Sequence, residues 1–375
     1  MPTTRGLRRD DADTTGHKTT PPARYGMSLE GHLVDGAVHV AGDARQRFYD
    51  SRGYGRPTGG REIDLSYVEA AHLLFRGDLD AVDGMAFRGF FAWATEERRR
   101  FGLRFLVYSD LRDRGFYLAP AREDWPGPDA PDADFAVFPR GKGPADGAIE
   151  HRVRVLGERE PVAPADLSPG VLAVVDEESE ITYLEVTEPA LEGSATDDLP
   201  EEVPGVLLED RVLCWEGATA LYEQGFYGQP LAGRHSVVED AVQLSLVEAA
   251  WLASAGALDL GDDGYGRVVA RGRAVEGERF DRRLRTYGEL RERGLVPKTG
   301  FKFGSDFRTY ADFDGVESLG HSEHLVRVVP PGHEFAPRDV SLDVRLAGGV
   351  RKRMVFALPG ANGGIDWLSV GRLTP

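Results

Sequence analysis

The sequence predicts an α+β fold made of two tandem repeats, each with an N-terminal helical or mixed lobe followed by a C-terminal α/β sandwich lobe. Three observations support this prediction. The 375 residues exceed what one hydrophobic core usually organises, so two or more domains are expected. Similar blocks of sequence recur in the same order, and within each copy the apolar spacing changes from helical to strand-like.

The duplication rests on pairs of matching blocks that follow one another in the same order in both halves of the chain. The pairs are GYGRP (53–57) and FYGQP (226–230), LSYVEAAHLL (65–74) and LSLVEAAWLA (244–253), YSDLRDRG (108–115) and YGELRERG (287–294), DFAVF (134–138) and DFRTY (306–310), HRVRV (151–155) and HLVRV (324–328), and LAVVDEESEITYLEV (172–186) and VFALPGANGGIDWLSV (355–370). Such an ordered series is not coincidence, so the chain is a duplicated unit of about 170 to 180 residues.

The first lobe of each copy is predicted to contain a helix with one buried stripe, because its apolar residues have helical spacing. These residues are Leu65, Val68 and Leu73 in the first copy and Leu244, Val247, Ala250 and Trp251 in the second. In the second lobe, alternation in FRTYADF, LVRVV, DVRL and MVFAL predicts strands. YSDLRDRG and YGELRERG each predict a short helix that ends at glycine.

These patterns divide the chain into six segments. We expect a disordered tail at residues 1–26, repeat 1 lobes at 27–97 and 98–187, a linker at 188–205, and repeat 2 lobes at 206–279 and 280–375. The tail is polar and has no apolar signal-peptide core. The linker is acidic, contains proline and has no apolar period.

Composition excludes several classes of protein. No apolar run approaches the ~20 residues of a membrane span, so we expect no membrane association and a cytoplasmic location. The single cysteine, Cys214, excludes an intramolecular disulfide and a cysteine-cluster metal site, and its VLCW context predicts a core position.

The charge pattern is unusual, because a formal net charge of −17 accompanies five lysines and forty arginines. Excess carboxylate with depleted lysine indicates a protein of very salty cytoplasm, and a GC-rich genome that favours arginine codons is the alternative explanation. At molar salt the Debye length is about 3 Å, so the net charge does not exclude a nucleic-acid partner. Residues 281–375 carry 15 Lys plus Arg and 12 Asp plus Glu, a net of +3, so an anion is expected to bind there.

The two copies differ chemically at three positions, where the second copy carries a polar group that the first lacks. Tyr310 corresponds to Phe138, His321 to Ala148, and Lys352 to Pro169. Each residue alone has an ordinary explanation, as a strand tyrosine, a turn histidine and a solvated surface lysine. Together, the three matched losses indicate one intact site and one degenerate site.

A phenol, an imidazole and an ammonium suit the cleavage of RNA without a metal. The reaction needs a base for the 2′-hydroxyl proton, an acid for the departing 5′-oxygen and a cation for the phosphoryl oxygens. Imidazole is the natural acid near neutral pH. A tyrosine, with an unperturbed pKa near 10, needs a cationic neighbour to act as a base, or else it orients the hydroxyl. A metal-dependent nuclease is the alternative, but no metal-ligand cluster of Asp and Glu stands out, so we expect no metal and no cofactor.

At GFKFGSDFRTY (300–310), HSEHLV (321–326) and RLAGGVRKRMVFAL (345–358), the chain closely resembles archaeal tRNA-splicing endonucleases, in the long two-repeat form that makes a homodimer. The resemblance covers residues 27–375. It implies a C-terminal nuclease lobe that excises introns from precursor tRNA at bulge-helix-bulge sites and leaves 2′,3′-cyclic phosphate and 5′-hydroxyl ends. The family's base, acid and transition-state stabiliser correspond to Tyr310, His321 and Lys352.

The resemblance also implies contacts to RNA and to a second copy of the chain. Two arginines that hold a bulge base in the family correspond to Arg345 and Arg372. An acidic loop of the non-catalytic unit, which enters a basic cleft of the partner chain, corresponds to Asp176, Glu177, Glu178 and Glu180, although composition alone would make this loop a solvated turn. The expected partners are therefore precursor tRNA and the chain itself. The alternative function is a non-catalytic RNA-binding or structural subunit of a splicing complex, which copy one fits and the intact trio of copy two opposes.

Overall fold

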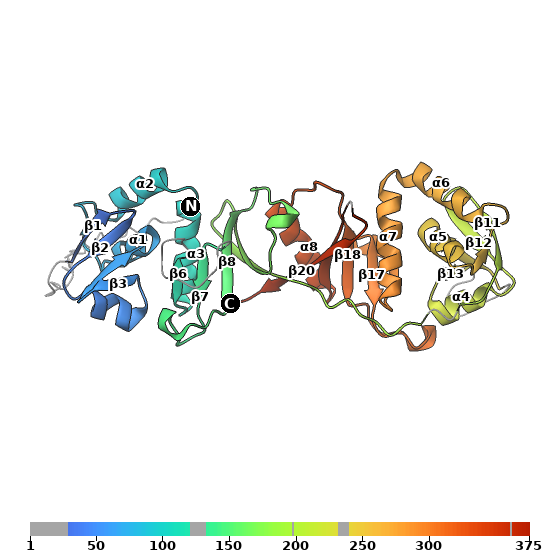
Figure 1. The fold of residues 1–375 in the computed structure, drawn as a ribbon, viewed down its shortest axis with the longest axis horizontal. Helices are drawn as coiled ribbons and strands as arrows, with labels where there is room; N and C mark the ends of the chain where they lie inside the picture. Colours follow the sequence, from blue (N-terminus) through green and yellow to red (C-terminus); the bar gives the residue numbers. More distant parts are fainter. Residues whose placement is uncertain (1–28, 121–132, 197–198, 232–239, 361) are drawn as a thin grey trace, which may run out of the picture.

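The computed structural model describes residues 29–120, 133–196, 199–231, 240–360 and 362–375. The tail predicted at 1–26 lies outside these ranges. A ten-stranded sheet occupies the middle of an elongated molecule, and a lobe with a five-stranded sheet lies at each end (Figure 1). Within the described residues, no helix is both long and apolar enough to cross a membrane.

The two end lobes have the same strand order, which confirms the predicted repeat. The orders are β3-β4-β2-β1-β5 in repeat 1 and β13-β14-β12-β11-β15 in repeat 2. The elements of repeat 1 are β1 Glu30–Val34, β2 Ala37–Val40, a π-helical turn Arg45–Asp50, β3 Arg56–Gly59, β4 Glu62–Leu65, α1 Tyr67–Arg76, β5 Ala81–Val82 and α2 Phe87–Glu97. Those of repeat 2 are β11 Val203–Leu207, β12 Arg211–Cys214, α4 Ala218–Gly225, β13 Gln229–Pro230, β14 Val242–Ser245, α5 Leu246–Ser254, β15 Leu258–Asp259 and α6 Gly264–Glu276. Cys214 is fully buried, as predicted.

The predicted helices of these lobes are α1 and α5, and each begins at a capping box. The side chains of Ser66 and Ser245 accept a hydrogen bond from the amide of the glutamate three residues later, and the carboxylate of that glutamate, Glu69 or Glu248, accepts one from the amide of the cap. Reciprocal capping satisfies two amides that a helix start would otherwise leave unpaired. The helices therefore start after the serines, and the leucines that precede them, Leu65 and Leu244, belong to the strands β4 and β14.

The two C-terminal lobes share the ten-stranded sheet, with the order β16-β17-β18-β19-β20-β10-β9-β8-β7-β6. The elements of repeat 1 are α3 Phe101–Asp113, β6 Leu118–Pro120, β7 Phe135–Val137, β8 His151–Gly157, β9 Gly170–Val175 and β10 Ile181–Thr187. Those of repeat 2 are α7 Arg279–Glu292, β16 Val296–Thr299, β17 Phe307–Tyr310, β18 His324–Val328, α8 Pro337–Gly349, β19 Arg353–Pro359 and β20 Ile365–Leu373. The YSDLRDRG and YGELRERG segments form the C-terminal parts of α3 and α7, which are longer than predicted.

Antiparallel pairing of β10 with β20 joins the repeats. Val186 pairs with Val370, and the hairpins that contain these two valines correspond residue by residue, so the pairing has an approximate two-fold axis at this point. Away from the axis, Val162 and Phe335 exchange two backbone hydrogen bonds of 2.9 and 2.8 Å. Apolar residues of both repeats, Val186 and Val370 among them, form one buried cluster on the α8 side of the sheet.

The two hairpins correct the register predicted at Lys352. The last pairs before the turns are Val175 with Ile181 and Pro359 with Ile365. Residues 171–186 therefore match 355–370 without a gap, and Lys352 corresponds to Ser168 and not to Pro169. The sequence alignment was wrong by one residue because the acidic turn and the glycine-rich turn share no letters that fix the register.

The DVRL segment, predicted as a strand, belongs to helix α8. Pro337 occupies the first turn, where its missing amide costs nothing, and Val340, Val344 and Ala347 form the buried face at helical spacing. Repeat 1 has no such helix among its described residues, because the connection from β8 to β9 spans 158–169 and contains only the 3-10 turn Pro164–Asp166. Arg345 therefore comes from a helix that has no counterpart among the described residues of copy one.

The described part of the predicted linker, 188–205, is attached to the C-terminal lobe of repeat 2. Leu191 is buried in the core of repeat 2, and the Gly193 and Ser194 amides donate to the carbonyls of Arg293 and Ala311 at 2.9 and 2.8 Å. β11 begins at Val203, inside the segment predicted as linker. Composition predicted a linker here, and backbone hydrogen bonds that any sequence can make attach this segment to the lobe.

Candidate active site

Three adjacent strands bring the predicted trio to one end of the catalytic sheet. Thr309 on β17 pairs with His324 on β18, which pairs with Arg353 on β19. Tyr310 follows Thr309, Lys352 precedes Arg353, and His321 lies three residues before His324. Since β18 runs antiparallel to β17 and parallel to β19, the end of β17 and the starts of β18 and β19 lie at the same end of the sheet.

Tyr310 lies in an aromatic and cationic environment. Its side chain is only 5% exposed, and its ring packs edge-on against Phe226 at a centroid distance of 5.8 Å. The Arg308 guanidinium carbon lies 5.7 Å from the centre of the Tyr310 ring. The ring is therefore held by the N-terminal lobe of the same repeat, which supplies Phe226.

Lys352 is linked directly to the segment that carries His321. Its ammonium donates a 2.7 Å hydrogen bond to the carbonyl of Ser322 and lies 5.9 Å from the centre of the Phe303 ring. Burial, and then the positive charge of Arg308, lower the pKa of Lys352. His321 itself is exposed to solvent.

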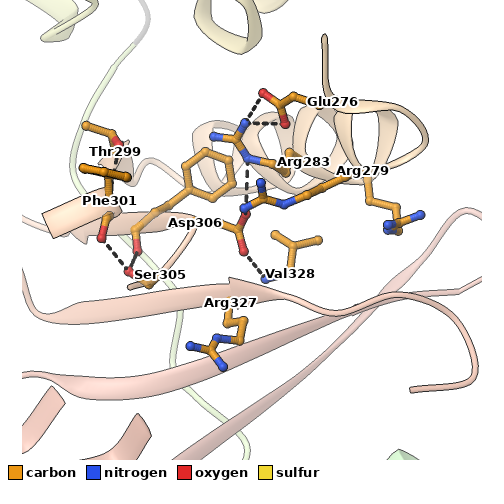
Figure 2. A network of polar contacts seen from close by, with 12 residues as sticks. Glu276, Arg279, Arg283, Thr299, Phe301, Ser305, Asp306, Arg327 and Val328 are labelled. Carbon is orange, nitrogen blue, oxygen red and sulfur yellow. Dashed lines mark hydrogen bonds and ion pairs between the residues drawn. The ribbon is translucent and has the colours of Figure 1, made fainter. Parts of the chain in front are cut away.

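A buried carboxylate, Asp306, fixes the start of β17 (Figure 2). It accepts a 2.8 Å hydrogen bond from the Val328 amide and forms ion pairs with Arg279 and Arg283 of α7 at 2.5 and 3.3 Å. Arg283 also binds Glu276 of α6. Figure 2 shows Arg283 between the carboxylates of Asp306 and Glu276.

The Asp306 contacts recur in the copy that lacks the trio. Asp134 accepts a 2.7 Å hydrogen bond from the Val155 amide and forms an ion pair with Arg104. Asp306 therefore belongs to the scaffold of the lobe and not to its chemistry.

A second buried contact, absent from repeat 1, joins the two lobes of repeat 2. The Lys298 ammonium donates to Glu248 at 2.7 Å and to the carbonyls of Phe226 and Gly228 at 2.9 Å each. Burial alone would raise the pKa of Glu248, but the Lys298 charge and the hydrogen bonds that the carboxylate accepts lower it to about 2. Because Phe226 packs on Tyr310, this ion pair also fixes the wall of the site.

Strand register identifies two further cations that the first copy lacks. Lys298 pairs with Arg308 across β16 and β17, whereas Ala119 pairs with Ala136 at the matching place in repeat 1. The sequence contained half of this signal, because Ala136 faces Arg308 when DFAVF is aligned with DFRTY. The prediction of the trio used only the last position of this alignment, Phe138 against Tyr310, and did not include Arg308.

Arg345 and Arg372, predicted as RNA-binding residues, line one cavity of about 370 Å³ between α8 and the β9–β10 hairpin. Asp176 and Glu158 also line this cavity. In the described part of the chain, neither arginine has a carboxylate within ion-pair distance.

The acidic turn between β9 and β10 has four carboxylates, of which one stabilises the turn and three are exposed on the surface. Asp176 accepts hydrogen bonds of 2.9 Å from the amides of Glu178 and Glu180, so it holds the turn together. Glu177, Glu178 and Glu180 are exposed, and Glu177 pairs with Arg159 at 2.8 Å on the surface. Among the described residues, no three His, Cys, Asp or Glu side chains are grouped so that they could hold a metal ion.

Comparison with known families gives matches to both lobes. The family of the catalytic C-terminal domain of tRNA intron endonucleases matches residues 280–367, and the N-terminal domain of the same enzymes matches twice, at 29–91 and 203–269. The chain is 60% identical over 348 residues to the tRNA-splicing endonuclease of Haloferax volcanii and 59% identical over 348 residues to that of Halobacterium salinarum, covering 92% of this chain and 100% of each relative. It is 37% identical over 371 residues to the tRNA-splicing endonuclease of Methanosarcina mazei, covering 92% of this chain and 99% of that protein.

Replacing Glu248 by Gln is expected to destabilise the protein at neutral pH by about 3 to 5 kcal/mol, because Lys298 is then left buried without a counter-charge. The matched control is Glu69→Gln in repeat 1, where no lysine is present and we expect a loss of about 1 to 2 kcal/mol. Urea unfolding of both variants in molar salt measures the difference. Equal losses would contradict the role assigned to the ion pair.

At acid pH, the same two variants should change the pH dependence of the free energy of unfolding in opposite directions. The folded-state pKa of Glu248 is depressed to about 2, so its contribution is present above the unfolded value near 4.5 and is lost as the pH falls from there toward 2. Burial raises the pKa of Glu69, so protonation at low pH favours its folded form. As the pH falls, the free energy of unfolding should therefore decrease less steeply in Glu248→Gln than in the wild-type protein. In Glu69→Gln it should decrease more steeply.

Proposed function

This chain belongs to the tRNA intron endonuclease family, and from that premise we propose that its second repeat excises introns from precursor tRNA by metal-independent attack of the 2′-hydroxyl, with Tyr310, His321 and Lys352 as the reacting groups. The endonuclease activity follows from identity over the full length of named tRNA-splicing endonucleases. One observation carries the assignment of the site. The three side chains lie at the same end of three adjacent strands, and Phe138, Ala148 and Ser168 occupy the matching places in repeat 1.

Each group has one step in the proposed reaction. The 2′-oxygen attacks phosphorus while the bond from phosphorus to the 5′-oxygen breaks. Tyr310 either accepts the proton of the 2′-hydroxyl as a base or orients that hydroxyl for attack. The His321 imidazolium gives a proton to the leaving 5′-oxygen. Lys352 stabilises the charge on the non-bridging oxygens. The products carry a 2′,3′-cyclic phosphate and a 5′-hydroxyl.

We further propose that Arg345 and Arg372 stack on an unpaired bulge base. Support comes from the cavity that both line and from the lack of a competing ion pair for either in the described residues. A guanidinium stacks on any base and depends less on long-range charge, which suits a site that works at high salt.

A homodimer is proposed on the charge of the acidic turn. The exposed Glu177, Glu178 and Glu180 of one chain would meet the positive C-terminal lobe of the partner, and a two-fold arrangement gives each chain one turn to insert and one cleft to receive. In this dimer, repeat 1 is the non-catalytic unit, which is the role that the alternative function predicted from the sequence would give it.

The decisive test is incubation of the purified protein with a bulge-helix-bulge RNA in excess chelator, followed by analysis of the product ends. We expect cleavage at the bulges and products with cyclic phosphate and 5′-hydroxyl ends. Products with 5′-phosphate, or a need for added metal, would refute the mechanism.

Replacing His321 by Ala should lower the single-turnover rate about 10²- to 10⁴-fold while RNA affinity stays near the wild-type value, since general acid catalysis is typically of that size. His333→Ala is the matched control, because this histidine packs on Phe335 in the same lobe away from the trio. Quench-flow cleavage and filter binding measure the two quantities. A wild-type rate in the His321 variant would remove it from the mechanism.

Changing Glu177, Glu178 and Glu180 together to Gln should weaken the homodimer and, through it, cleavage. Asp176 is left in place because its replacement would open the turn itself. A control triple variant removes the exposed carboxylates of Glu30, Glu96 and Glu97. Light scattering at micromolar concentration in molar salt measures the mass, and a dimer that cuts at the normal rate would show the turn to be plain surface.

A further inference from the structure

Arg308 is held beside the catalytic trio but has no role in the reaction described above. It lies on β17 two residues before Tyr310, so the two side chains leave the strand on the same face. Its guanidinium carbon is 5.7 Å from the centre of the Tyr310 ring. The nearest cations are Lys298, its partner across the strands, and Lys352, and the charge of Arg308 contributes to lowering the pKa of both ammonium groups.

Among the described residues, the Arg308 guanidinium has no anionic partner. Its Nε is buried without a hydrogen-bond acceptor, and in the part of the chain that the structure describes no carboxylate lies within ion-pair distance of it. In contrast, Arg283, Arg327 and Arg353 of the same lobe each have a carboxylate partner. Arg308 is therefore a cation with a buried Nε beside the trio for which the described part of the chain supplies no counter-charge.

Arg308 faces a cavity of about 380 Å³ between the two lobes of repeat 2. Other cations on its wall are already neutralised, because Arg211 pairs with Asp210, and Lys298 with Glu248. The side chains of Gln229, Gln243 and Thr299 add neutral hydrogen-bonding groups. None of the catalytic trio lines this cavity, but Arg308 borders both the cavity and the Tyr310 ring, so it lies between the trio and the cavity.

The degenerate copy provides an independent observation. Ala136 occupies the place of Arg308 in repeat 1, on a strand whose pairing is otherwise the same. The scaffold carboxylate Asp134 was kept there, whereas the cation was lost together with the trio. Arg308 therefore differs between the copies as the reacting groups do, and not as the scaffold does.

We propose that Arg308 binds a backbone phosphate of the substrate RNA that flanks the scissile phosphate, with its nucleotide in the cavity between the lobes of repeat 2. This inference rests on the proposed function. A guanidinium offers two parallel N–H donors to a phosphate, which supplies both the missing acceptor and the missing negative charge.

The test uses the full-length protein and a bulge-helix-bulge RNA with 2′-deoxynucleotides at the cleavage positions, so that binding is measured without reaction. Arg308→Gln should weaken binding about tenfold and reduce the slope of log affinity against log salt by about one. On cleavable RNA at saturating enzyme, its single-turnover rate should stay within about threefold of wild type. Arg308→Lys should retain part of the affinity, because it keeps the charge but loses the paired donors.

Thermal unfolding separates this role from a structural one. Removal of an unpaired guanidinium between two lysines should leave the melting temperature of Arg308→Gln unchanged or higher. The control is Arg273→Gln, which removes an exposed charge paired with Asp281 and should change neither affinity nor salt slope.

Each other outcome overturns the proposal. Unchanged affinity and salt slope would show that Arg308 touches no phosphate, and a large fall in rate at unchanged affinity would place it on the reacting group. A fall in melting temperature with loss of binding would make it structural. If wild-type protein fails to cut the RNA, the proposed function fails first, whereas a wild-type enzyme unaffected by Arg308→Gln refutes this inference alone.

Discussion

The pairing of β10 with β20 is the constraint on which the rest of the structure depends. Five ladder pairs, with Val186 opposite Val370, turn two sheets that would each expose an edge into one sheet of ten strands. An open edge is a template for unwanted association, so closing the edges on each other protects both repeats. The same pairing builds the buried cluster under α8, and β8, β9 and β10 of repeat 1 thus support the helix that leads to Lys352.

Each hairpin is also tied to the helix of its own repeat by one aromatic donor. Tyr183 donates to Asp110 of α3 at 2.7 Å, and at the corresponding place Trp367 donates to Glu289 of α7 at 2.9 Å. The side chains differ, but the geometry of a ring that reaches from the sheet to a helix carboxylate is kept. Divergence in this protein has therefore preserved hydrogen-bond patterns where the fold needs them and changed charged groups where it does not.

The extent to which the sequence predicts this structure follows the same division. The repeat, the helices α1 and α5 and the trio were predictable, because periodic apolar residues and a self-comparison expose them. Pairing of β10 with β20 was not, since backbone amides and carbonyls make ladders without regard to the letters. Helix α8 was missed because the four letters DVRL fit a period of two as well as one of 3.6. Arg308 was missed because a single arginine among forty has no pattern of its own, and its lack of a carboxylate partner is visible only in three dimensions.

The charge of the protein can now be reconciled with an RNA substrate. Composition predicts a protein that works at high salt, and at molar salt the Debye length is about 3 Å. The repulsion between a net charge of −17 and RNA is then screened, and only groups in contact with the RNA interact with it strongly. Under such screening, a binding site gains most from cations that are held in place and left without internal partners. Paired cations such as Lys298 stabilise the wall of the site, and unpaired ones beside it, Arg308 above all, remain available to an external anion.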